Sequence, residues 1–155
     1  MPFAILWPTF ALVLLIFIVL GVMAARRFSH IRRHPPSESD FATSEAAQHY
    51  FQPVEMAANN LRNLFEMPVL YFALVPLLLV TRHGDHLQAI LAWLFVALRA
   101  VHSFIHIGPN RVKLRFVAFA ASCVVLAAMW IGFFVDMLHA ASLYHQAVAD
   151  TYPIR

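Results

Sequence analysis

Residues 52–76 read QPVEMAANNLRNLFEMPVLYFALVP, and this stretch decides the fold. At about 100° per residue, one narrow sector of a helix collects the polar side chains Glu55, Asn59, Arg62 and Glu66, with Asn63 on its flank. The same segment then continues to Val80 in apolar residues of the kind that cross a bilayer. The stretch therefore predicts a transmembrane helix that carries a polar stripe into lipid.

Such a stripe needs a reason, because an ionised side chain facing hydrocarbon costs at least a few kcal/mol. Arg62 and Glu66 lie four residues apart, a spacing at which opposite charges partly neutralise each other. One interpretation is a binding site between transmembrane helices. The other is that the pair holds helices together, with Asn59 and Asn63 hydrogen-bonding across the interface. The stretch on its own favours neither.

The composition indicates a membrane protein that crosses the bilayer several times. Of 155 residues, 61% are hydrophobic and 12% are charged, whereas charged residues make up about 25% of a soluble domain. The mean hydropathy is +0.70. The single cysteine, Cys123, excludes an intrachain disulfide and is expected to be a small buried hydrophobe. The net charge of +3 is modest and its basic residues are clustered, so a nucleic-acid partner is not indicated.

We expect an all-α membrane protein, a four-transmembrane-helix bundle in a single domain over residues 1–155. The predicted helices span about 3–25, 54–80, 87–107 and 112–140, with a cytoplasmic loop over 26–53. Pro68 is expected to kink the second helix just beyond Glu66. The acidic part of the loop is expected to be solvated, and a lid over a site is the alternative. Beyond residue 140 we expect a short tail.

The basic residues set the expected orientation. Residues at the predicted inner ends of the helices are Arg26, Arg27, Arg32, Arg33, Arg111, Lys113 and Arg115, whereas Arg82 and Arg155 lie outside. By the positive-inside rule, both termini are expected to lie outside the cytoplasm. The absence of a retrieval signal favours a bacterial inner membrane over the endoplasmic reticulum.

A second polar stripe lies on the predicted helix 87–107 and its end: Arg99, His102, Ser103, His106 and Asn110. Because this helix runs antiparallel to 54–80, the stripe is expected at the same depth as Arg62 and Glu66. His83 and His86 are expected to be solvated turn residues, and no metal site is predicted. One alternative takes His102 and His106 as ligands of haem or another metal.

The Arg62-Asn63-x-x-Glu66 run, followed by Pro68, resembles the signature of the MAPEG superfamily of membrane proteins in eicosanoid and glutathione metabolism. Arg99 and His102 resemble the Arg-x-x-His pair of its prostaglandin synthase branch, and Arg115 falls where an arginine opens the fourth helix. The resemblance implies a homotrimer of four-helix subunits. It also implies glutathione in each crevice between neighbours, near the cytosolic face.

The resemblance further implies an enzyme that transfers glutathione to hydrophobic electrophiles, or a peroxidase-like relative. The residues implied to hold glutathione are Arg62, Asn63, Glu66, Arg99, His102 and Arg115. Arg115 and His106 are implied to be catalytic, with Arg115 favouring thiolate over thiol. The chain departs from the family where His106 and Phe119 stand at tyrosine-like positions. A non-catalytic lipid- or thiol-binding protein of the same fold is the alternative.

Overall fold

The computed structural model describes residues 3–151, and within that range it contains helices and no strand. The helices are α1 (Leu6–Arg33), η1 (Glu38–Phe41), α2 (Ser44–Phe51), η2 (Gln52–Val54), α3 (Met56–Glu66), α4 (Pro68–Val80), α5 (His86–Ile107) and α6 (Val112–Thr151), where η marks a short 3-10 turn. Four stretches are long and apolar enough to cross a membrane: Leu6–Arg33, Met56–Val80, His86–Ile107 and Val112–Val148. The predicted all-α class with four membrane-spanning helices is confirmed.

Two helices run further than the sequence indicated. Helix α1 continues through the first arginines to Arg33 instead of ending at Ala25, because no proline or glycine lies between Ala25 and Pro35. Helix α6 continues to Thr151 instead of ending at Ala140, so the expected short tail is helical. The expected loop over 26–53 is shorter and contains α2, whose first turn is capped by Thr43 (Ala46 N to Thr43 Oγ1, 3.1 Å).

The second segment is interrupted just before Pro68, where the sequence led us to expect a kink. Helix α3 ends at Glu66 and α4 begins at Pro68, with Met67 between them in a helical backbone conformation. Proline has no backbone N–H to donate to the preceding turn, so the hydrogen-bond ladder breaks there. Pro76 lies inside α4 without ending it.

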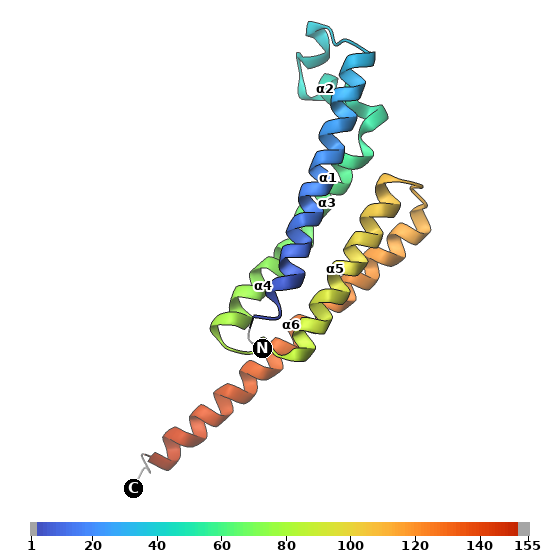
Figure 1. The fold of residues 1–155 in the computed structure, drawn as a ribbon. Coiled ribbons are helices and arrows are strands. Elements are labelled where there is room, and N and C mark those ends of the chain that lie inside the picture. The colour runs from blue at the N-terminus through green and yellow to red at the C-terminus, as the bar shows by residue number, and fades with distance from the viewer. Residues whose placement is uncertain (1–2, 152–155) are drawn as a thin grey trace.

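The chain folds into two adjacent groups of helices (Figure 1). Helix α1 packs on α3, and α5 packs on α6, while α1–α5, α3–α5 and α4–α6 contacts join the groups. The end of α1 that carries its arginines lies at the top of the view with α2 beside it, and the C-terminal end of α5 lies below them. Helix α1 begins at the opposite end of the bundle, and the last turns of α6 project beyond that end.

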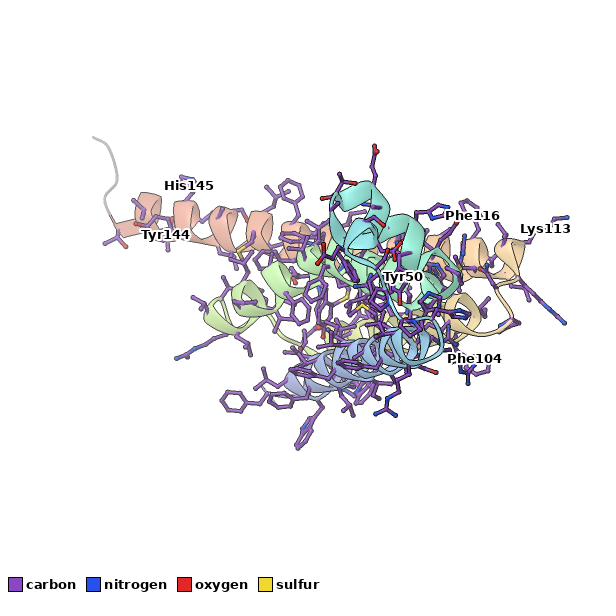
Figure 2. The ribbon with its side chains drawn as sticks, turned by 90° about the horizontal axis from the view of Figure 1, so that it is seen from above. Tyr50, Phe104, Lys113, Phe116, Tyr144 and His145 are labelled. Carbon is purple, nitrogen blue, oxygen red and sulfur yellow. The ribbon has the colours of Figure 1, made fainter. Side chains whose placement is uncertain are left out.

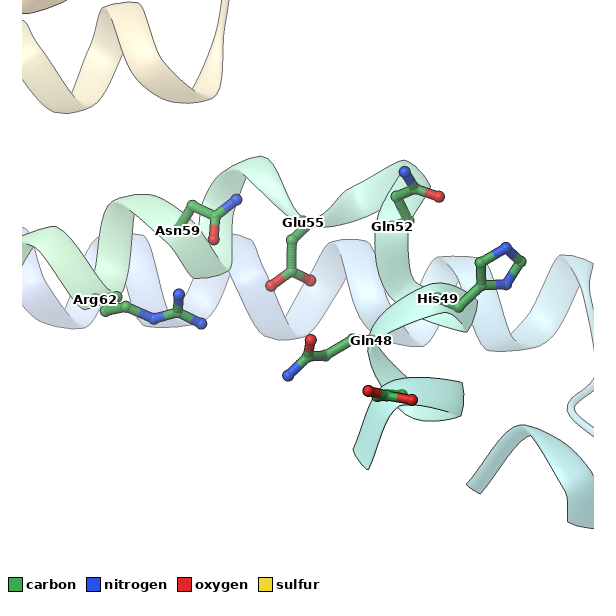
Figure 3. Close-up of a pocket in the computed structure, with 7 residues that line it drawn as sticks. Gln48, His49, Gln52, Glu55, Asn59 and Arg62 are labelled. Atoms are coloured by element: carbon green, nitrogen blue, oxygen red, sulfur yellow. The ribbon is translucent and has the colours of Figure 1, made fainter. Parts of the chain in front are cut away.

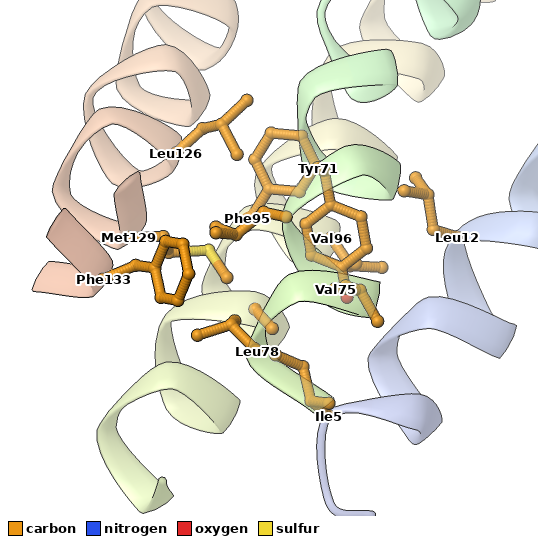
Figure 4. Packing of buried hydrophobic residues seen from close by; sticks show 12 residues of the cluster. Ile5, Leu12, Tyr71, Val75, Leu78, Phe95, Val96, Leu126, Met129 and Phe133 are labelled. Carbon is orange, nitrogen blue, oxygen red and sulfur yellow. The ribbon is translucent and has the colours of Figure 1, made fainter. Parts of the chain in front are cut away.

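The apolar core lies in the half of the bundle away from the arginines. Tyr71 of α4 stacks on Phe95 of α5 with ring centroids 5.2 Å apart, and its hydroxyl lies 2.9 Å from Thr9 Oγ1 of α1 (Figure 4). Many large apolar side chains point outward instead, such as Phe104 and Phe116, which are 74% and 66% exposed (Figure 2). An apolar exterior of this kind suits a lipid environment.

Candidate functional site

A pocket of about 230 Å³ opens between α3, α5 and α6 near the arginine-bearing end of the bundle. We call it the α3–α5–α6 pocket. Its lining residues are Asn63, His102, His106, Val112, Arg115, Phe116 and Phe119. The structure thus brings together four side chains that the sequence singled out from three different helices.

Arg99 lies directly behind this pocket and is completely buried. Its Nη2 donates to the backbone oxygen of Asn63 at 3.0 Å and to Asn63 Oδ1 at 2.5 Å. The guanidinium also lies over the Phe119 ring, 5.6 Å from its centroid. Its Nε and Nη1 have no hydrogen-bond partner, and no carboxylate within residues 3–151 forms a salt bridge with it. A buried charge without a counter-ion is costly, so Arg99 favours an anion nearby.

His102 is held in one orientation by the first turns of α6. Its Nδ1 lies 3.0 Å from the backbone oxygen of Arg115. Because a carbonyl oxygen only accepts, Nδ1 carries the proton in that contact, and Nε2 is the ring atom left for another partner. Nε2 of His102 and Nδ1 of His106 are both buried and have no hydrogen-bond partner within residues 3–151. The two rings lie 5.5 Å apart and perpendicular. Two imidazole nitrogens are therefore free to meet a ligand.

Arg115 is aimed by a residue of the preceding turn. Its Nη1 donates to Asn110 Oδ1 at 2.7 Å, and Asn110 in turn donates to Met56 Sδ at 3.4 Å. Asn110 has a positive φ of 46°, which asparagine tolerates better than most residues. The contact uses one of the five N–H donors of Arg115 and leaves the others for a ligand.

Glu66 lies at the exposed edge of the same group and accepts a hydrogen bond from Asn63 Nδ2 at 3.3 Å. The expected neutralisation by Arg62 does not occur, because no salt bridge joins the two side chains in residues 3–151. Glu66 is thus the acidic group linked to the α3–α5–α6 pocket, through the amide of Asn63.

Arg62 lies in a different place. It lines a second pocket, of about 470 Å³, with Glu45, Gln48, His49, Gln52, Glu55 and Asn59 from α2, η2 and α3 (Figure 3). Arg62 and His102 therefore line different pockets within one chain. The physical reason is the helix period: neighbouring residues point about 100° apart, so Asn63 faces α5 while Arg62 faces α2.

Sequence reasoning missed Asn60, which is completely buried behind the site. Its Oδ1 accepts from Ser103 Oγ at 3.3 Å, and its Nδ2 has no partner. The signal was present, since Asn60 precedes Asn63 by three residues and shares its helix face. Asn110 was noted only as part of a stripe, and its hold on Arg115 was not foreseen.

The fold does not support the alternative of a metal site. Within residues 3–151 no three side chains of His, Cys, Asp or Glu gather as a metal-binding group. The charged groups around the α3–α5–α6 pocket are instead Arg99 and Arg115, with Glu66 at the edge. This balance suits a ligand that carries negative charge.

The comparisons with known proteins agree with this membrane fold. Residues 5–135 match the model of the MAPEG family, a range that runs from the start of α1 well into α6. No curated protein and no solved structure matches the chain. Because the match covers most of the chain, including all the residues of the α3–α5–α6 pocket, the chain belongs to the MAPEG family.

Proposed function

We propose that the protein is an integral membrane enzyme that transfers glutathione to hydrophobic electrophiles, or reduces hydroperoxides with it. One observation carries the proposal. Arg115 lines a pocket in which two histidine nitrogens are buried and have no partner within residues 3–151, and the buried Arg99 contacts the lining residues Asn63 and Phe119, in a chain of the MAPEG family. Nε and Nη1 of Arg99 are buried donors without a partner among the described residues, which is costly, and an anionic ligand would satisfy them. His102 Nε2 would instead accept a hydrogen bond from an N–H or S–H group of the ligand.

The residues present fit glutathione, which carries two carboxylates, one ammonium group and a thiol. Arg99, His102 and Asn63 would hold its polar groups, and Glu66 would receive the ammonium group. When bound, glutathione would supply the sulfur nucleophile. Arg115, fixed by Asn110, would hold that sulfur in its anionic form. His106 would donate a hydrogen bond or move a proton at Nδ1, which has no other partner.

We further propose that the site is completed by a second copy of the chain in a homotrimer. At about 230 Å³ the pocket is smaller than the roughly 300–1,000 Å³ of most small-molecule sites. Its wall includes Phe116, whose side chain is 66% exposed and points away from the bundle. The arginine-bearing end would face the cytoplasm of a bacterial inner membrane, with both termini on the far side.

A second candidate function is binding of a thiol or lipid without catalysis. It is supported by the ring of Phe119, which packs against His102 at 5.8 Å and under Arg99. This position offers no hydroxyl to a bound sulfur, so Arg115 would be the main group to stabilise the thiolate.

The variant Arg115→Ala distinguishes the catalytic function from binding without catalysis. Detergent-purified protein would be assayed for conjugation of glutathione to 1-chloro-2,4-dinitrobenzene, with calorimetric titration of glutathione alongside. We expect Arg115→Ala to lower kcat about 100- to 1,000-fold while changing Kd by only a few fold, because the lost contact matters mainly in the transition state. Lys113→Ala is the matched control. It removes the same charge from an exposed position in the same helical turn.

The outcomes separate the candidates. Binding without turnover in the wild-type protein would support the non-catalytic function. An equal loss in Arg115→Ala and Lys113→Ala would mean that general positive charge, not the placed guanidinium, is responsible. If Kd alone rose in Arg115→Ala, the thiolate-stabilising role would be wrong.

A further inference from the structure

One face of helix α1 lines two hollows that have no part in the proposed function. Its membrane half contributes Leu15, Ile18, Val19 and Val22 to a groove of about 340 Å³ against α5. Its outer half contributes Arg26, Ser29, His30 and Arg33 to a second hollow of about 330 Å³. These positions recur every three or four residues, so they lie on one face of the helix. We call the two hollows the α1–α5 groove and the basic pocket.

The α1–α5 groove is apolar along its length. From α5 it is lined by Ala100, Ser103, Phe104 and Ile107. Ser103 Oγ donates to Asn60, so the groove's one hydroxyl is directed into the protein. From Leu15 to Val22 the groove extends about 10 Å at 1.5 Å per residue. This is within half of the roughly 30 Å hydrocarbon core.

The basic pocket adjoins the groove at a hydrogen bond. Arg26 Nη2 donates to the backbone oxygen of Ile107 at 3.1 Å, which links the last turn of α5 to α1. Among the residues that the structure describes, no aspartate or glutamate lines the pocket. The nearest acidic residue along the chain, Glu55, instead pairs with Arg27, 3.7 Å away. The pocket therefore holds two arginines and two histidines, counting His34, without a counter-ion.

We propose that the groove and the basic pocket together bind one anionic phospholipid. The phosphate would meet Arg26, Ser29 and Arg33, and one acyl chain would lie between α1 and α5. The order of the chemistry along α1 supports this: an apolar groove within the bilayer leads directly to a cationic hollow at its surface. Basic pockets at the ends of transmembrane helices bind anionic headgroups in this way. This inference does not depend on glutathione or on catalysis.

Native mass spectrometry of the detergent-purified protein tests the headgroup contact. The protein would be equilibrated with equal amounts of phosphatidylglycerol and phosphatidylcholine, and the ratio of the two bound lipids measured. We expect a preference for phosphatidylglycerol that Arg33→Gln lowers about fivefold, the effect of about one charge at a membrane surface. Arg32→Gln is the matched control. Arg32 is also exposed in the last turn of α1 but does not line the pocket, so less than about a twofold change is expected.

A second pair of variants tests the acyl-chain contact. Ala100→Phe places a ring in the groove, whereas Ala97→Phe adds the same ring at an exposed position of α5 outside it. We expect only Ala100→Phe to reduce the retention of both lipids.

Three results would overturn the proposal: no preference for phosphatidylglycerol, equal effects of Arg32→Gln and Arg33→Gln, or no difference between the alanine variants. Displacement of phosphatidylglycerol by inorganic phosphate at matched ionic strength would assign the pocket to a soluble anion and also overturn it. Oligomers that retain no lipid would show that a second copy covers the groove.

Discussion

Asn63→Leu is the substitution that probes the site most sharply without touching a charge. Asn63 supplies both oxygens that Arg99 Nη2 contacts, one from its backbone and one from its side chain. Leucine keeps the backbone oxygen and a similar volume but removes Oδ1. Arg99 Nη2 would then keep only its bond to the backbone oxygen, while Nε and Nη1 stay without partners among the described residues.

The size of the effect follows from that one lost bond. A hydrogen bond to a charged group contributes about 1.5–3 kcal/mol to stability. The bond from Asn63 Nδ2 to Glu66 is exposed and long, at 3.3 Å, so its loss adds little. For a chain of this length, 1 kcal/mol corresponds to about 2–4 °C in the unfolding midpoint. We therefore expect a fall of about 4–8 °C, since about 2 kcal/mol is lost.

Thermal unfolding in detergent, followed by intrinsic fluorescence, measures this shift. Asn59→Leu is the matched control: it makes the same change one turn earlier, where the asparagine faces the Arg62 pocket. Asn63→Asp keeps an acceptor for Arg99 and should hold the midpoint within about 2 °C of the wild type. If Asn63→Leu and Asn59→Leu shift the midpoint equally, Arg99 does not depend on Asn63 and the reasoning is wrong.

Two further changes test the rest of the fold. Tyr71→Phe removes the hydroxyl that lies 2.9 Å from Thr9 Oγ1 in the core, and we expect calorimetry to show a loss of about 1 kcal/mol; a variant as stable as the wild type would mean that this bond has no net value. Arg27→Gln removes the ion pair with Glu55 and the contact with the Phe51 ring, 4.6 Å from the guanidinium carbon. Because such partly exposed contacts contribute about 1 kcal/mol or less, we expect faster limited proteolysis between α1 and α3 with little change in the midpoint, and an unchanged cleavage rate would contradict the role assigned to Arg27.

The fold was largely readable from the sequence because lipid imposes simple rules. Runs of apolar residues of bilayer length predicted the four spans, and Pro68 predicted the break between α3 and α4. The positions of the helix ends were predicted less accurately. A charged residue does not stop a helix, so α1 passes through Arg26 and Arg27 to Arg33. Hydropathy marks where a helix leaves the apolar layer, and it does not mark where the backbone stops being helical.

The sequence predicted which residues belong to the site better than it predicted which of them lie together. The three- and four-residue spacing of Arg99, His102 and His106 predicted one face of α5, and all three are buried on it. Periodicity on α3 also grouped Arg62 with Glu66, yet it could not tell which side of α3 would meet α5. That choice depends on the packing of the buried Asn60 and on the position of α2, which are tertiary features.

The central claim is that the anionic thiol is held by Asn63, His102 and Arg115, and that the pocket of Arg62 is not its site. A structure determined from crystals of the protein grown in the presence of glutathione tests this most directly. We expect density for the tripeptide in the α3–α5–α6 pocket, within hydrogen-bonding distance of His102 Nε2 and of a free N–H of Arg115. Glutathione density among Glu55, Asn59 and Arg62, with the histidine nitrogens still unpartnered, would contradict the claim.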